Sequence, residues 1–229
     1  MKFLSTLGLL GATATLSGCL GSDNILDNPE YNLVEAFALV DRFGSAAEVS
    51  PEDLPAEATM SGFVEVFSEE DNTDDSTFVV AGDMNMTADF SNSRITGGAT
   101  NLAEYEVFGD CDSVSTCDAE FQQSFGGSLE IRSDEEDDGV EEAFGIIEGS
   151  SFRGWLDGSL TGSIEDEGAG SGTFVADVIT DFNGSFRSDD QGLIAAADVD
   201  GSVTITPTID GVEYESEVQS VSGGFVVAE

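Results

Sequence analysis

The chain has 229 residues, of which 40% are apolar, and it contains 27 glycines but only 4 prolines. This composition is typical of one folded domain rich in strands and turns, and it excludes a chain that is disordered throughout. The net charge of −41, from 47 acidic residues against 6 basic ones, excludes nucleic-acid binding and electrostatic docking on anionic lipid.

Residues 1–18 have the pattern of an export signal. Lys2 precedes an apolar run that is too short to span a membrane, and small residues follow it. Residues 16–19, Leu-Ser-Gly-Cys, resemble the bacterial lipobox, in which the cysteine is lipidated and becomes the first mature residue. We therefore expect a lipid on Cys19, the alternative being an ordinary signal peptide with an incidental cysteine. Because Leu20 rather than an aspartate follows, sorting in Gram-negative bacteria favours the outer membrane.

Removal of the signal would leave no lysine and five arginines against 47 acidic residues, a net charge of −42. One explanation is adaptation to salty surroundings, where a Debye length of about 5 Å or less screens the repulsion between acidic groups. The other explanation is binding of divalent cations. We favour the first.

The next segment predicts one amphipathic helix. Asn28 is the expected cap, Pro29 belongs to the first turn, and Gly44 ends the helix. The apolar side holds Leu33, Val34, Phe37 and Val40. Because the polar side is acidic, we expect this apolar side to cover an open end or an edge of the sheet, not a membrane. Residues 45–58 follow as a connector with two prolines.

Residues 77–102 carry the longest alternating pattern and predict a long hairpin. The apolar positions are Phe78, Val80, Gly82, Met84, Met86, Ala88 and Phe90. Ser91, Asn92 and Ser93 indicate the reversal, after which Ile95 and Ala99 continue the apolar face. The first strand would span about 40 Å at roughly 3.3 Å per residue, which exceeds a usual strand. We therefore expect it to bend around a core.

The hairpin sequence Ala-Asp-Phe-Ser-Asn-Ser-Arg-Ile-Thr-Gly at residues 88–97 resembles that of the transferrin-binding protein B-like β-barrel lipoproteins. Residues 182–186 are similar to the late glycine-aromatic strand of that family, and residues 222–228 to its closing strand. The resemblance covers residues 59–229, with a departure at residues 187–191, where the family has a tyrosine-glycine-proline-like turn. It implies a β-barrel that captures an extracellular partner.

Two cysteines remain once Cys19 is assigned to the lipid. An exported compartment permits oxidation, so we expect Cys111 and Cys117 to form a disulfide. A ring this small contributes about 2 kcal/mol to stability in the chain-entropy model. A zinc site would need more cysteine or histidine ligands than the chain contains.

Residues 134–139 form an acidic segment with two interpretations. Asp134, Glu136 and Asp138, followed by Gly139, have the offsets of the start of an EF-hand calcium loop. The expected terminal glutamate falls on Gly145, however, and no flanking helices are predicted. A solvated acidic turn is therefore favoured over this weak metal site.

Further strands are predicted at residues 60–67, 121–131, 143–148, 151–164, 172–180, 182–187, 192–206 and 212–228, the last with a bend near Ser222. Asp210 and Gly211 indicate a hairpin turn, and residues 198–201 a strand interruption or bulge. The predicted fold class is all-β, a small antiparallel up-and-down-type barrel of about eight strands preceded by one N-terminal helix. The predicted domains are a signal peptide at residues 1–18, the anchor, helix and connector at residues 19–58, and the barrel at residues 59–229.

Trp155 has two possible positions. If strand 151–164 is continuous, Trp155 lies outside with Arg153 and Asp157, an arrangement in which binding hot spots are enriched. If Asp157 and Gly158 form a turn that resets the alternation, Trp155 lies in the core. The core position is slightly favoured.

Absent residue types argue against catalysis. Without histidine or a mature lysine the chain cannot build a Ser-His-Asp triad, a histidine zinc centre or a Schiff base. We expect no cofactor and a non-catalytic lipoprotein on the outer membrane, at the cell surface of a Gram-negative bacterium. It would bind an unknown extracellular protein or solute through loops at one barrel end. The candidate contacts are Arg153, Trp155, Asp189, Asp190 and residues 134–142. The alternatives are a structural envelope lipoprotein without a specific ligand or a two-carboxylate carbohydrate-active enzyme.

Overall fold

The computed structural model describes residues 33–68, 76–108, 118–133, 136–137, 140–141, 144–166 and 170–229. The residues predicted for the lipid anchor, the disulfide and the calcium loop lie outside this part of the chain, or have side chains that do: Cys19, Cys111, Cys117, Asp134, Glu136 and Asp138. The lipidation, the disulfide and the metal site therefore stay predictions.

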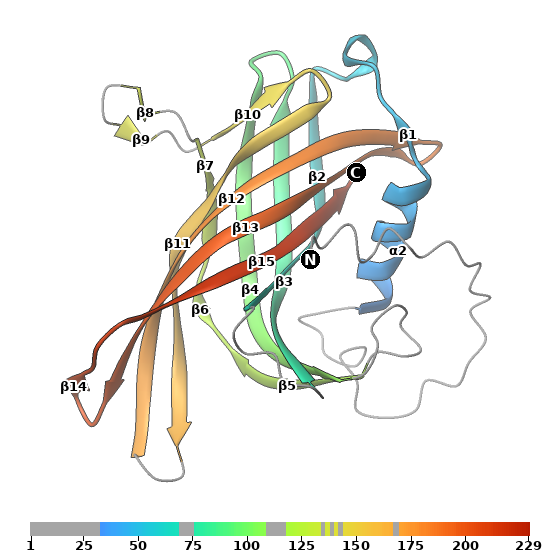
Figure 1. Cartoon of the computed structure of the whole chain (residues 1–229). Coiled ribbons are helices and arrows are strands. Elements are labelled where there is room, and N and C mark those ends of the chain that lie inside the picture. The colour runs from blue at the N-terminus through green and yellow to red at the C-terminus, as the bar shows by residue number, and fades with distance from the viewer. Residues whose placement is uncertain are drawn as a thin grey trace.

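One α-helix precedes a succession of strands (Figure 1). The elements are α2 (Leu33–Ser45), β1 (Ala47–Glu48), the 3₁₀ turn η2 (Pro51–Asp53), β2 (Glu57–Ser68), β3 (Ser76–Asp89), β4 (Arg94–Phe108), β5 (Asp118–Ser124), β6 (Gly126–Gly127), β7 (Leu129–Arg132), β8 (Glu136–Asp137), β9 (Val140–Glu141), β10 (Gly145–Glu148), β11 (Ser151–Asp166), β12 (Gly170–Asp189), β13 (Gly192–Ile209), β14 (Val212–Glu213) and β15 (Glu217–Ala228).

Eight strands close into a ring. Their order is β2, β3, β4, β10, β11, β12, β13 and β15, and β15 pairs back with β2. Every pairing in the ring is antiparallel. The predicted fold class, a small antiparallel barrel preceded by one helix, is confirmed.

The long hairpin forms as predicted from β3 and β4. The side-chain amide of Asn92 donates a 2.6 Å hydrogen bond to the Asp89 carboxylate, and the Asn92 backbone N–H donates another of 3.0 Å. These bonds stabilise the charged carboxylate and lower the pKa of Asp89. A register shift between Ala81 and Asp83 bends the pair, as closure of a ring requires.

Large aromatic side chains fill the interior of the ring between β11, β12 and β15. Phe152 contacts Phe186 and Phe182, with ring centroids 4.7 Å and 6.1 Å apart, and Phe182 contacts Phe225 at 5.5 Å. Gly184 provides the space for this cluster, because a Cβ there would lie 2.3 Å from Cζ of Phe152. The cluster is close-packed, like a protein core.

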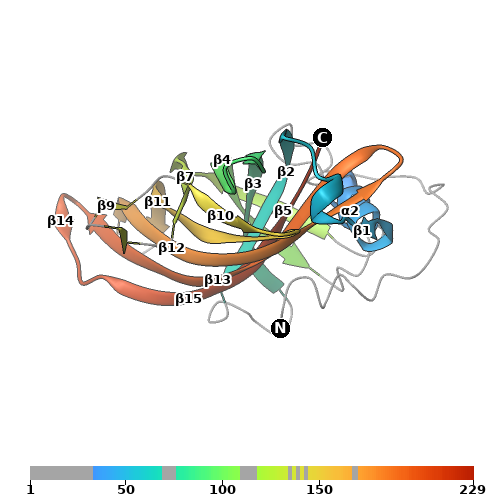
Figure 2. The same cartoon turned by 90° about the horizontal axis from the view of Figure 1, so that it is seen from above.

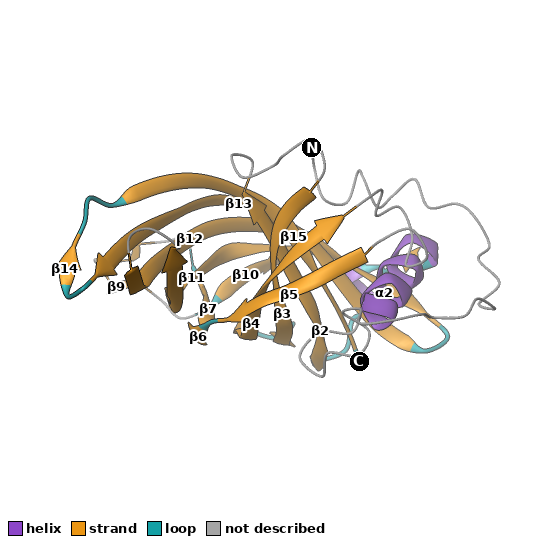
Figure 3. Ribbon diagram, turned by 90° about the horizontal axis from the view of Figure 1, so that it is seen from below, coloured by secondary structure: helices purple, strands orange, loops and turns teal. Residues whose placement is uncertain are grey.

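Helix α2 lies against the outside of the ring, over β13 and β15 (Figures 2 and 3). Its last turn packs Phe43 on outward side chains of the wall, including Ile194 and Val226. The expectation that the helix covers an open end or an edge is therefore wrong. The reason is that β13 and β15 are apolar on both faces at this point, so their outer face also needs a cover.

Two arginines attach the end of α2 to β12. Arg42 donates to both carboxylate oxygens of Asp189, at 2.7 Å and 2.9 Å. Arg187 donates a 3.0 Å bond to the backbone oxygen of Phe43, and its guanidinium carbon lies 4.4 Å from the centroid of that ring. The first contact supplies a bidentate ion pair, and the second satisfies a C-terminal helix carbonyl.

Several predicted strand boundaries are wrong. Residues 121–131 form three separate strands, broken where Gly127 adopts a φ of +107°. Residues 172–187 instead belong to one strand, and residues 198–201 pair with β12 without interruption. The last segment breaks at residues 214–216 and not near Ser222. Acidic residues within β12 and β13 point outward to solvent, so they do not end a strand.

Candidate functional site

Trp155 lies on the outer face of the barrel. β11 pairs with β12 over its whole length without a register shift, so the turn expected at Asp157 and Gly158 does not form. Gly154 and Leu156 therefore point inward, while the Trp155 side chain is 41% exposed. The slightly favoured prediction of a core position is wrong, and the alternative outside position beside Arg153 is correct.

The register places polar side chains on both sides of Trp155. Trp155 pairs with Asp181 on β12 and with Arg132 on β7, and Asp181 pairs in turn with Asp200 on β13. Side chains paired in this way lie about 4.5–5.5 Å apart at their Cβ atoms. Segments from four strands thus meet in one outward row.

The neighbouring row begins two residues earlier on β11. Arg153 pairs with Asn183, and Asn183 pairs with Asp198. Because alternate residues of a strand share a face, this row lies beside that of Trp155, about 6–7 Å away along β11. The outer wall therefore presents guanidinium, amide and carboxylate groups next to the indole ring.

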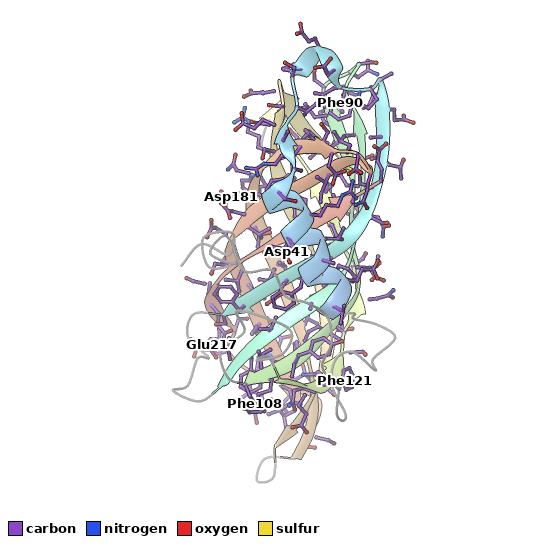
Figure 4. All side chains as sticks on the ribbon, turned by 90° about the vertical axis from the view of Figure 1, so that its right-hand side faces the viewer. Asp41, Phe90, Phe108, Phe121, Asp181 and Glu217 are labelled. Atoms are coloured by element: carbon purple, nitrogen blue, oxygen red, sulfur yellow. The ribbon has the colours of Figure 1, made fainter. Side chains whose placement is uncertain are left out.

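A recess of about 840 Å³ opens between this wall and the end of α2. The wall contributes Arg153, Asn183 and Asp198, and the helix contributes Asp41 and Phe43. Figure 4 shows Asp41 on the helix in front of the wall and Asp181 projecting outward beside it. Of the residues that attach α2 to β12, Phe43 and Arg187 also line the recess.

The recess has little net charge. Three carboxylates, from Asp41, Glu148 and Asp198, face two guanidinium groups, from Arg153 and Arg187. The whole chain, by contrast, has 47 acidic residues against 6 basic ones. The recess is thus a place where arginine is concentrated in a strongly acidic protein.

The arginines of the site are held by neighbouring groups. Arg153 lies 3.5 Å from the Glu148 carboxylate, and Arg132 lies 3.1 Å from Asp157 and 3.4 Å from Glu130. Contacts between such exposed groups stabilise the fold little. They restrict the directions in which the guanidinium donors point, which reduces the entropy lost when a ligand binds.

The other two predicted contact residues do not line the recess, although Arg187, two residues from Asp189 on β12, does. Asp189 is six residues beyond Asn183 on β12, about 20 Å along the strand, and Asp190 is in the turn that follows. Asp189 is also engaged by Arg42, whose hydrogen bond lowers the pKa of the carboxyl to about 2. The same contact raises the pKa of Arg42. Asp189 therefore helps to attach helix α2 to β12.

Sequence analysis missed most of the wall. Asn183, Arg187 and Asp198, and Asp41 and Phe43 on the helix, were not predicted as site residues. Alternation within β12 and β13 could have placed the first three on one face. It could not have shown that this face lies beside Arg153, because strand register and the position of α2 arise only in the folded chain.

In the described ranges, no three Asp, Glu, Cys or His side chains are grouped so that they could hold a metal ion. No helix of that part of the chain combines the length and apolar content needed to cross a membrane. Comparison of the chain with family models, with curated proteins and with solved structures gives no match.

Proposed function

We propose that this protein is a non-catalytic lipoprotein, anchored through Cys19 on the outside of the outer membrane, that captures an extracellular partner or solute with the outer wall of its barrel. The observation that carries the proposal is the recess beside α2, with Arg153 in its wall and the exposed Trp155 next to it. An exposed tryptophan beside arginine is typical of binding hot spots.

The packed interior supports binding on the outside. Met84, Met86 and Phe182 are at most 1% exposed and belong to the same buried cluster as Phe152 and Phe225. A small-molecule site needs an accessible concavity lined by a few polar groups. The recess on the outer wall has these properties. We therefore propose contacts on the strands and on the helix end, and not on the loops at one barrel end.

The proposed location at the cell surface and the proposed type of partner rest on the sequence. The lipobox-like residues 16–19 support lipidation, and the resemblance to transferrin-binding protein B-like lipoproteins supports capture at the cell surface. A structural envelope lipoprotein without a ligand is the competing proposal. A protein without a ligand would not require a near-neutral recess in so acidic a chain.

The proposed lipidation and surface location are tested with the full-length chain in a Gram-negative host. Mass spectrometry of the membrane-bound product should find an acylated N-terminus at Cys19, and Cys19→Ala should release the protein from the membrane. Protease added to intact cells should digest the chain. A soluble, unacylated product or complete protection from protease would contradict the proposed address.

Capture is tested with the same cells. Cells that display the full chain are incubated with concentrated medium, washed and analysed for retained proteins and solutes. Trp155→Ala and Arg153→Ala should reduce saturable retention while the amount of displayed protein stays equal. Tyr214→Ala is the matched control, because Tyr214 is also an exposed aromatic residue, 53% accessible, but lies beyond β14, away from the recess. Equal retention by cells without the chain would refute capture.

A further inference from the structure

We propose that the recess and Trp155 together bind an extended, uncharged glycan. This inference rests on the proposed capture function, and it assigns a chemical class to the ligand. Three properties of the wall carry it: the indole face, the mixture of hydrogen-bonding groups, and the local balance of charge.

The Trp155 side chain is 41% exposed on the outer face of the barrel. It stands on a strand rather than a loop, between the polar residues Asp181 and Arg132. Pyranose rings have one face of C–H groups and an edge of hydroxyl groups. Such a ring can lie flat on an indole while its hydroxyls reach the flanking side chains, which matches an aromatic residue surrounded by polar ones.

The wall offers donors and acceptors in alternation. Across one row, the Arg153 guanidinium only donates hydrogen bonds, the Asn183 amide both donates and accepts, and the Asp198 carboxylate only accepts. A hydroxyl group also does both, so adjacent sugar hydroxyls can form hydrogen bonds with each kind of group in this row. An apolar ligand would displace water from these polar groups and offer no hydrogen bonds in exchange, which is costly.

The charges disfavour charged ligands. A polyanionic glycan would meet the net charge of −41 and the three carboxylates of the recess. A cationic ligand would be drawn to the protein as a whole but would lie against Arg153 and Arg187 within the recess. A neutral ligand avoids both penalties, because its hydroxyl groups can donate hydrogen bonds to the carboxylates and accept them from the guanidinium groups.

The dimensions favour a chain of sugars over a single unit. Ser151, Arg153 and Trp155 follow one another on the outer face of β11 and span about 13 Å. Ser185, Asn183 and Asp181 run beside them on β12. A polar surface of this length beside Trp155 suits an extended oligosaccharide laid along the strands.

The single tryptophan of the chain gives a direct test. The full-length protein, solubilised in detergent, is titrated with cellohexaose, laminarihexaose, mannohexaose and maltohexaose while the tryptophan emission is recorded. Stacking removes water from the indole, so we expect at least one of these probes to give a saturable shift to shorter wavelength. The corresponding monosaccharides should bind more weakly.

Variants test whether the wall supplies the contacts. Arg153→Ala and Asn183→Ala keep Trp155, and each should weaken the responding probe by about tenfold or more. Tyr214→Ala should bind like the original chain. Equal affinity in all three variants would overturn the assignment, as would a response to spermine or polygalacturonate without a response to any neutral oligosaccharide.

The two proposals fail in different ways. If displaying cells retain a protein through Trp155 but no oligosaccharide changes its emission, capture stands and the glycan inference is wrong. If a neutral oligosaccharide binds but protease does not reach the chain on intact cells, the glycan site stands and the surface address is wrong.

Discussion

The two faces of β11 and β12 differ in burial and in chemistry. The inward residues Phe152, Leu156 and Phe182 are at most 3% exposed and belong to one buried cluster. The outward residues that alternate with them, such as Arg153 and Trp155, remain accessible beside the recess. One pair of strands therefore carries the core on one face and the candidate site on the other.

This arrangement teaches that stability and binding can be changed separately along the same strand. Removing an inward side chain leaves a cavity in a close-packed core. Removing an outward side chain changes only surface groups, and such substitutions usually alter stability by less than about 0.5 kcal/mol. Truncation of an inward residue should therefore cost more stability than truncation of an outward residue on the same strand.

Phe182→Ala should have the largest effect. Phe182 is 1% exposed and contacts both Phe152 and Phe225, so its truncation should lower the free energy of unfolding by about 3–5 kcal/mol. Urea unfolding followed by circular dichroism measures the change, with Trp155→Ala as the outward control. If the two variants lost equal stability, the separation of the faces would fail.

Gly184→Ala should have the next largest effect. The added Cβ would lie 2.3 Å from Cζ of Phe152 and 2.5 Å from the backbone oxygen of Ala196, so the cluster must shift, at about 1–3 kcal/mol. Gly44→Ala is the matched control, because a Cβ there meets nothing within 4 Å. Equal unfolding midpoints for the two variants would show that the cluster is looser than its contacts imply.

Asp189→Asn should lower stability by less, and the loss should depend on pH. The pKa of Asp189 is lowered from 3.8 to about 2, so its contact with Arg42 stabilises the fold fully above pH 4 and is lost as the pH falls through 2. The Tm difference between the original chain and the variant should therefore shrink between pH 4 and pH 2. A difference that is constant over this range would contradict a role for the charged carboxylate.

Neutral salt should give a gradual rise in Tm. Screening weakens repulsion among the acidic groups, and no Asp or Glu side chain of the described residues is fully buried. At fixed ionic strength, calcium should add little beyond magnesium. A calcium-specific rise in Tm would instead support a metal site at residues 134–139.

The sequence by itself determined the fold class and the local alternation. The pattern of residues 77–102 places Met84 and Met86 inside, and the turn at residues 91–93 falls where predicted, because both signals arise from neighbouring residues. The turn at Asp210 and Gly211 is another example, since both residues adopt the positive φ that such a tight turn requires.

The positions of those strands relative to one another depend on long-range packing and could not be read from the local pattern. The division of residues 121–131, the outer position of α2 and the outward position of Trp155 depend on strand pairing and on what covers each face. The same holds for the recess, since Asp41, Arg153 and Asp198 come from distant segments. The physical reason is that alternation is encoded within one strand, whereas register and coverage are set by packing between segments far apart in the chain.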